Sequence, residues 1–205
     1  MSNTGQQKRS LHINLSRMRK AFSLKPLSLG VTAVLLSACG GNREEAIVFQ
    51  TLDDCTKQYP EASEQCKTAY QGALEEAART GPKYGSQRDC EYDFGPNQCQ
   101  VVQTNSGSMF MPFMAGYMIA NILSPRPYYN PLFTSYSPYS PYRYRWLGAD
   151  GVDFGDFKKR RYSVRKDAFD KKPAVSRTIK RGGFGSSVRA KSNWGSRSGS
   201  KGWGG

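Results

Sequence analysis

The stretch SEQCKTAYQGALEEAARTG, residues 63–81, carries the clearest secondary-structure signal in this chain of 205 residues. Cys66, Ala69, Tyr70, Ala73 and Ala77 recur at steps of three and four, so they share one face of a helix. The serine that precedes this run favours a helix start, and the Gly-Pro pair after it favours a helix end. The sequence therefore predicts a helix whose buried face is narrow and built mostly of alanines.

The N-terminal segment has the features of a secretion signal. Residues 1–25 contain six Lys or Arg and no Asp or Glu, and Leu27–Ala38 is mostly apolar but too short to cross a bilayer. The break LSAC, residues 36–39, resembles the lipobox of bacterial lipoproteins, which implies cleavage after residue 38 and acylation of Cys39. We therefore predict a signal peptide over residues 1–38 and a lipid anchor at Cys39. Gly40 in place of an Asp favours the outer membrane over the inner membrane of the cell envelope.

The other four cysteines suit disulfides in an exported chain. Cys55 and Cys66 have ten residues between them, and Cys90 and Cys99 have eight. Local pairs are the first choice, and nested pairs, Cys55 with Cys99 and Cys66 with Cys90, are the second. A zinc site is the alternative, but these gaps exceed the two to four residues usual between paired ligands. Disulfides are also expected because the narrow alanine face of the predicted helix can bury only a small core, and a small core needs covalent support.

The predicted fold class is mostly α. After a tether over residues 39–50, a small cysteine-stapled helical domain is expected over residues 51–123. Its last element is MFMPFMAGYMIANIL, residues 109–123, an uncharged run with four Met. This run is expected to be a helix, either buried, or interfacial and partner-binding, or crossing a membrane. Its apolar residues lie all round, so periodicity does not choose between these roles.

Residues 124–157 are predicted to be a linker. SPRPYYNPLFTSYSPYSPYRYRW, residues 124–146, holds six Tyr and five Pro, and Pro at this density opposes helices and central strands. An extended, partly polyproline-like conformation is expected. The segment is either a spacer or a contact surface for glycan or protein, because tyrosine rings supply stiff contact area.

Residues 158–205 are predicted to form a basic, Gly/Ser-rich, disordered tail. Residues 140–205 hold 17 Lys or Arg and 5 Asp or Glu, whereas residues 39–139 hold 7 and 11. For an exported protein, such a tail would meet lipopolysaccharide, peptidoglycan or an envelope protein, so no nucleic acid partner is expected despite its aromatic and basic mixture. The residues predicted to make these contacts are Lys158, Lys159, Arg160, Arg161, Arg181, Phe184, Trp194 and Trp203.

No catalytic constellation is evident in the sequence. The single histidine, His12, lies in the predicted signal peptide, which excludes His-dependent nucleophilic catalysis from the mature chain. Asp150, Asp153 and Asp156 stand three apart, whereas calcium loops of the EF-hand type use every second position. The sequence predicts no enzyme, no cofactor and no metal site.

Several short motifs occur together and in order: LLSAC (35–39), DDC (53–55), CKTAY (66–70), ARTGPKY (78–84), FGPNQC (94–99), MPFMAGYM (111–118) and RGGFG (181–185). In these the chain resembles the YgiB family of uncharacterised bacterial lipoproteins. The resemblance implies lipidation and paired cysteines and brings no catalytic residues. The Tyr/Pro segment and the basic stretch near residue 160 depart from the family pattern.

These observations favour a lipid-anchored, non-catalytic envelope lipoprotein, held in the membrane by its acyl chains, whose basic tail contacts anionic envelope material. The alternative is an adaptor or inhibitor of an envelope enzyme that docks through residues 109–123.

Overall fold

The computed structural model describes residues 42–104 and 107–196, and it is rich in β-structure. In chain order the elements are β1 (Arg43–Phe49), α2 (Leu52–Gln58), η3 (Pro60–Ala62), α3 (Ser63–Thr80), α4 (Gln87–Phe94), β2 (Cys99–Thr104), β3 (Gly107–Pro112), β4 (Gly116–Ala120), β5 (Tyr128–Phe133), β6 (Arg145–Gly148), β7 (Asp153–Asp156), β8 (Arg161–Arg165), η4 (Lys166–Phe169) and α5 (Gly183–Ser196). The prediction of a mostly α fold is wrong, because a nearly closed six-stranded antiparallel sheet organises this part of the chain.

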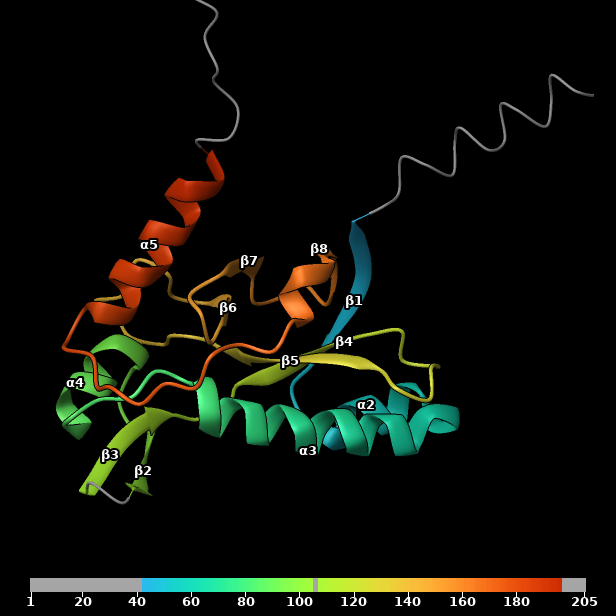
Figure 1. The fold of residues 1–205 in the computed structure, drawn as a ribbon, viewed down its shortest axis with the longest axis horizontal. Coiled ribbons are helices and arrows are strands. Elements are labelled where there is room, and N and C mark those ends of the chain that lie inside the picture. The colour runs from blue at the N-terminus through green and yellow to red at the C-terminus, as the bar shows by residue number, and fades with distance from the viewer. Residues whose placement is uncertain (1–41, 105–106, 197–205) are drawn as a thin grey trace, which may run out of the picture. The chain divides into compact units, whose positions relative to one another are not determined.

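The sheet has the strand order β7-β6-β5-β4-β1-β8, and β2 and β3 form a separate two-stranded ribbon. Alternate residues of β1 point to opposite faces. Ala46 and Val48 pack inside the curled sheet with Met118, whereas Phe49 packs with Tyr117 on the other face. That outer face is covered by α2 and α3, and Figure 1 shows α3 running along the sheet.

The predicted helix of residues 63–81 is confirmed as α3. Its alanine face, including Ala69, Ala73 and Ala77, is buried. The helix ends at Thr80, and the Gly81 amide donates to the carbonyl of Ala77 over 2.7 Å. Small side chains allow the helix to lie close to the sheet, so its sequence pattern and its packing agree.

The expected helix over residues 109–123 is wrong. This run is divided between β3 and β4, with Pro112 at the end of β3 and the bend of residues 113–115 between the two strands. All five residues of β4 are buried, because this strand lies inside the sheet with both faces covered. Such a strand is apolar at every position and cannot be distinguished from a buried helix by periodicity. The adaptor model that required this helix loses its docking element.

The expected linker over residues 124–157 is also wrong, because it contains β5, β6 and β7. Pro131 lies within β5, an internal strand, where proline is ordinarily excluded. The neighbouring β6 pairs with β5 only at Leu132 and Phe133, and the carbonyl of Leu132 points to the β4 side, where it accepts the amide of Ala115. Pro131 therefore faces the side where β6 has ended, and its missing N–H interrupts no pairing.

The expected disorder of residues 158–205 is wrong for the residues that the structure describes, which include β8, η4 and α5. In β8, Tyr162 and Val164 are buried between exposed neighbours, and in α5, Phe184 and Val188 are buried one turn apart. The tether also ends earlier than expected, since β1 begins at Arg43. The signal peptide of residues 1–38, Cys39 and Trp203 lie outside the described residues.

The structure contains the two local disulfides, Cys55 with Cys66 and Cys90 with Cys99. The first joins α2 to α3, and the second joins α4 to β2. No group of three or more metal-ligating side chains occurs in the described part of the chain. Within the same residues, no helix combines the length and apolar character that crossing a bilayer requires.

Candidate functional site

An open hollow of about 730 Å³ lies between the loop that follows β5 and the turn that joins β7 to β8. We call it the tyrosine groove. Its lining residues are Tyr136, Pro141, Arg143, Tyr144, Arg145, Asp156, Phe157 and Lys158. The volume falls within the range of small-ligand sites, about 300 to 1,000 Å³, and the lining combines aromatic rings with a few charged groups.

Aromatic rings in edge-on contact form the wall of the tyrosine groove. The ring centre of Tyr136 lies 5.8 Å from that of Tyr144 and 6.2 Å from that of Phe157. Phe157 in turn lies 4.4 Å from the buried ring of Trp146. These contacts connect the exposed rings to the core, so the groove presents flat apolar surfaces whose positions are fixed by packing.

Tyr144 adopts a left-handed backbone conformation, with φ of 57°. Its amide donates to the carbonyl of Ser135 over 2.9 Å, and its own carbonyl accepts the amide of Phe157 over 3.0 Å. For a residue with a β-carbon this conformation costs about 1 to 2 kcal/mol. The two hydrogen bonds impose it, and the consequence is that the ring of Tyr144 is held 47% exposed in the groove. Strain of this kind is often found at functional sites.

The strain predicts an inverted effect of side-chain size at position 144. Tyr144→Gly and Tyr144→Ala both remove the ring, but only alanine keeps the left-handed penalty. We expect the glycine variant to be more stable than the alanine variant by about 1 kcal/mol, measured by urea unfolding. At ordinary loop positions the order is reversed, because glycine gains more entropy on unfolding. Equal or greater stability of the alanine variant would contradict the left-handed geometry.

The tyrosine groove carries an excess of positive charge. Its lining has three basic residues and one acid, a difference of two. Arg145 is neutralised by Asp153, with Nε 2.6 Å from the carboxylate. Arg143 donates to the hydroxyl of Tyr144 over 2.8 Å and lies over that ring, but neither Arg143 nor Lys158 has an ion pair with a described residue. Two cations are therefore available beside the rings.

Hydroxyl groups near the tyrosine groove stay protonated at neutral pH. Burial, with a smaller contribution from Tyr144, raises the pKa of Tyr136 above its ordinary value. Burial, together with Asp156, raises the pKa of Tyr162 to about 12. The phenol of Tyr136 is consequently a hydrogen-bond donor and adds no negative charge to the site.

A second hollow, of about 420 Å³, lies between α3, β5 and η4. Its lining has three acids and three bases, so its charge is balanced. Glu76 and Arg79 pair with each other in a two-point contact, at 2.6 and 2.8 Å. Tyr128, Tyr129 and Phe169 line it as well, but because it lacks an excess of positive charge, this hollow is a weaker candidate for an anionic ligand than the tyrosine groove.

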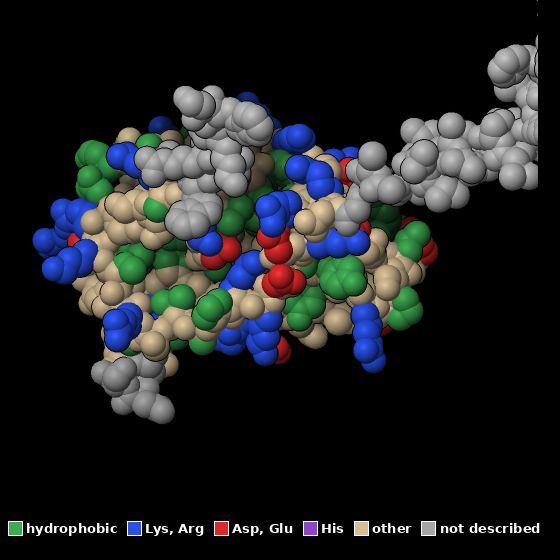
Figure 2. All heavy atoms as spheres, turned by 45° about the horizontal axis from the view of Figure 1, so that its top comes forward, with side chains coloured by type: hydrophobic (Ala, Val, Ile, Leu, Met, Phe, Trp, Pro, Cys, Tyr) green, Lys and Arg blue, Asp and Glu red, His purple; other side chains and the backbone are tan. Residues whose placement is uncertain are grey.

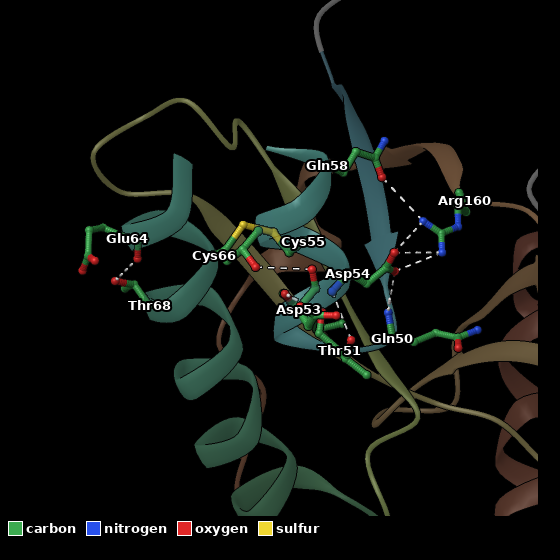
Figure 3. Close-up of a disulfide and its surroundings, with 12 residues drawn as sticks. Gln50, Thr51, Asp53, Asp54, Cys55, Gln58, Glu64, Cys66, Thr68 and Arg160 are labelled. Carbon is green, nitrogen blue, oxygen red and sulfur yellow. Dashed lines mark hydrogen bonds and ion pairs between the residues drawn. A yellow bond between two sulfur atoms is a disulfide. The ribbon is translucent and has the colours of Figure 1, made fainter. Parts of the chain in front are cut away.

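Of the residues predicted to contact polyanions, some are exposed in the structure and others have partners within the protein. Lys158 lines the tyrosine groove, Lys159 lies 5.1 Å over the ring of Tyr162, and Arg161 is exposed on β8. Arg160 instead binds within the protein, as Figure 3 shows: its guanidinium donates to Asp54 of α2 over 3.0 and 3.1 Å. Trp194 lies within α5, where its side chain is not described.

Arg181 and Phe184 also have internal contacts rather than a free surface. Arg181 pairs with Asp89 at 3.2 Å and lies over the ring of Tyr92. Phe184 is buried against Phe94, with ring centres 5.0 Å apart. The RGGFG motif therefore fastens the C-terminal segment to α4.

Part of the groove comes from the Tyr/Pro segment, which was predicted to be either a spacer or a contact surface, but the sequence alone did not show which of its residues would line a groove.

Figure 2 looks onto the side of Figure 1 that carries β7, β8 and α5. Lys and Arg side chains spread across this face among apolar patches, with a small acidic group near its centre. The residues missed by the sequence reasoning were Tyr136, Arg143, Tyr144, Arg145 and Phe157, and only the density of Tyr and Arg in residues 136–145 indicated them.

The comparisons with known proteins identify relatives but no activity. A family model described as a protein of unknown function (DUF1190) matches residues 43–195. The UPF0441 protein of Erwinia tasmaniensis is 42% identical over 205 residues, which cover 91% of this chain and 92% of that protein. UPF0441 protein SG0265 of Sodalis glossinidius is 40% identical over 200 residues, covering 91% and 93%. These matches confirm the resemblance to an uncharacterised bacterial family. No solved structure gives a significant match.

Proposed function

Because this chain belongs to the DUF1190 family of proteins of unknown function, we propose its role from its own geometry. It is a non-catalytic lipoprotein of the cell envelope, anchored through acylated Cys39, and its tyrosine groove binds anionic envelope glycan. The outer membrane is the proposed location. The lipobox at residues 36–39 and the basic segment before it support the anchor and the export.

The observation that carries the glycan proposal is the pair of cations beside the aromatic wall. Arg143 and Lys158 lie on a groove whose other walls include Tyr136, Tyr144 and Phe157. Sugar rings have apolar faces that pack on aromatic side chains, and phosphate or carboxylate groups bind Arg and Lys through charge-assisted hydrogen bonds. A neutral sugar would leave the cations unused, and a small anion would leave the rings unused. A phosphorylated sugar uses both.

Binding to a deacylated lipooligosaccharide tests the proposal, since this phosphorylated core glycan is soluble. We expect the variant Arg143→Gln with Lys158→Gln to bind at least about tenfold more weakly than the wild type in calorimetric titration, because it loses two charge-assisted contacts. The wild type is expected to bind the enzymatically dephosphorylated glycan more weakly as well. Soluble muropeptides, titrated in parallel, distinguish a carboxylate-bearing glycan from a phosphorylated one.

The matched control is Arg88→Gln with Lys180→Gln. These two exposed cations also lack ion pairs among the described residues, and the substitution changes the net charge equally. We expect it to bind like the wild type. Equal weakening of both double variants would mean that only overall charge attracts the glycan. No binding of either glycan class by the wild type would overturn the groove as the binding site.

A further inference from the structure

One end of the sheet displays exposed apolar side chains. In the sheet register, Ala46 of β1 lies opposite Ala120 of β4, and Ala120 lies opposite Tyr128 of β5. The start of β1, the loop between β4 and β5, and the start of β5 therefore share this end. Leu123 in that loop is 68% exposed, and Tyr128 is 52% exposed.

The loop between β4 and β5 is constrained in a way that holds Leu123 outward. Asn121 has φ of 53°, and its carbonyl accepts the amide of Ser124 over 2.8 Å. Ile122 is 9% exposed and packs in the cluster that contains the Cys55–Cys66 disulfide. One branched side chain is thus fixed inside and the next is held in solvent. Burial of this leucine against another apolar surface would therefore be favourable.

Basic side chains, together with Glu44, Glu45 and Asp167, occur in the loop and on the strands at this end of the sheet. Arg126, in the same loop, is exposed and has no ion pair with a described residue. Arg43 lies opposite Arg165 in the pairing of β1 with β8, and Lys166 follows directly. Arg165 pairs with Asp167 at 2.8 Å and Lys166 with Glu44 at 3.4 Å, both with largely exposed basic groups. Exposed pairs of this kind contribute little and exchange readily for other anions.

The length of chain before β1 identifies the surface that covers this end. The present inference rests on the proposed lipid anchor at Cys39. Three residues lie between Cys39 and Arg43, and the four Cα-to-Cα steps that join them span at most about 14 Å. Since the acyl chains lie in the membrane, the first strand must begin close to the headgroups. The sheet end with Leu123 is the end at which β1 begins.

We propose that this sheet end is a docking surface for an anionic bilayer. Leu123 enters the boundary between headgroups and acyl chains, Tyr128 lies at the level of the headgroups, and Arg126 with Lys166 binds lipid phosphates. Aliphatic, tyrosine and basic side chains in this combination suit an interfacial contact. The acyl anchor determines that the protein stays at the membrane, and the docking surface determines its orientation there.

The docking surface also determines where the tyrosine groove faces. The strand β5 starts at Tyr128, at the docking end, and the loop that lines the groove follows Phe133 at the other end. Six residues of strand separate the two by about 20 Å. The groove therefore faces away from the bilayer that holds the anchor.

Fluorescence of a tryptophan at position 123 tests the orientation. The full-length lipoprotein carries Leu123→Trp together with Trp194→Phe and Trp203→Phe, so that buried Trp146 is the one other emitter. It is reconstituted in vesicles of phosphatidylcholine and phosphatidylglycerol, three to one, with doxyl-labelled lipid. We expect emission from position 123 to shift to the blue and to be quenched about twofold relative to unlabelled vesicles.

The matched control is Val101→Trp in the same background. Val101 is 54% exposed and lies on the β2–β3 ribbon, at the far end of α3, whose last residues neighbour Met111 of β3. We expect its emission to resist quenching. If both variants float with the vesicles and are quenched equally, the docking surface is overturned while the anchor stands. If neither floats, the anchor at Cys39 is overturned, and the inference with it.

Discussion

An Asp93→Ala variant is expected to lose about 3 to 4 kcal/mol of unfolding free energy, measured by urea denaturation. Asp93 is 8% exposed, and its carboxylate accepts the hydroxyl of Tyr84 over 2.7 Å and the amide of Gly182 over 2.8 Å. It also accepts the amide of Phe184. Alanine would leave all three donors without acceptors, two of them on the buried residues Tyr84 and Phe184, and each buried donor left unpaired costs about 1 to 3 kcal/mol.

The control is Asp93→Asn, which keeps an oxygen for the two amides of the RGGFG motif and an amide that can donate to Tyr84. We expect it to lose much less stability than the alanine variant. If asparagine and alanine destabilise equally, the carboxylate contributes through its charge and not as a shared acceptor.

The wild type and the Asp93→Asn variant are expected to differ in how their stability depends on pH. Burial raises the pKa of Asp93 above its ordinary value of 3.8, despite opposing hydrogen bonds from Tyr84 and the two amides. The native state therefore holds this proton more tightly than the unfolded chain. The contribution of Asp93 to stability is greatest below pH 3.8 and declines as the pH rises through its higher native pKa. The asparagine variant lacks this decline, so its stability relative to the wild type should improve across that window.

Removal of the Cys55–Cys66 disulfide, by Cys55→Ala with Cys66→Ala, is expected to cost about 2 to 4 kcal/mol. The bond closes a short loop, with 11 residues of sequence separation, and it retains α2, a helix of seven residues that is too short to persist alone. Its loss also frees the partner of Arg160, because Asp54 lies in α2 beside Cys55 (Figure 3). Thermal unfolding of the oxidised wild type and the double variant measures the difference.

Two comparisons sharpen the disulfide prediction. Asp54→Asn, with both cysteines present, removes the charge that pairs with Arg160 and leaves an oxygen for the long hydrogen bond from the Gln50 amide, so it should cost less than about 1 kcal/mol. Dithiothreitol reduces the Cys90–Cys99 disulfide as well, so the treated wild type should be at least as destabilised as the double variant. Identical unfolding temperatures with and without reductant would show that α2 is held by packing alone and would contradict the prediction.

The elements that could be predicted from sequence are those whose pattern is local. α3 was recognised because Ala69, Ala73 and Ala77 repeat on one helical face, and Cys55 with Cys66 suggested a short covalent loop. The strand β4 was missed because a strand buried on both faces shows no alternation. In β8, Tyr162 and Val164 do alternate with exposed residues, but the surrounding positive charge was interpreted as a solvated tail.

The tyrosine groove could not be predicted from any short stretch of sequence, because it depends on contacts between residues that are far apart in the chain. Tyr136 and Arg143 were visible as part of a Tyr/Pro-rich segment, but Phe157 and Lys158 join them only because β6 pairs with β7. The glycines around Phe184 similarly obscured its one-turn spacing from Val188 and suggested disorder. In both places the structure is determined by tertiary contacts and not by the local amino-acid composition.

Because β1 pairs with β8, the N-terminal strand cannot complete its folding until the C-terminal part of the chain is available. Residues 43–47 need partners that emerge about 118 residues later, and the core around Phe94 stays open until Phe184 and Val188 arrive. Contacts so distant in sequence form slowly and late. A chain threaded from its N-terminus through a translocation pore would consequently remain unfolded until nearly its whole length had passed, which suits a route that accepts only unstructured polypeptide.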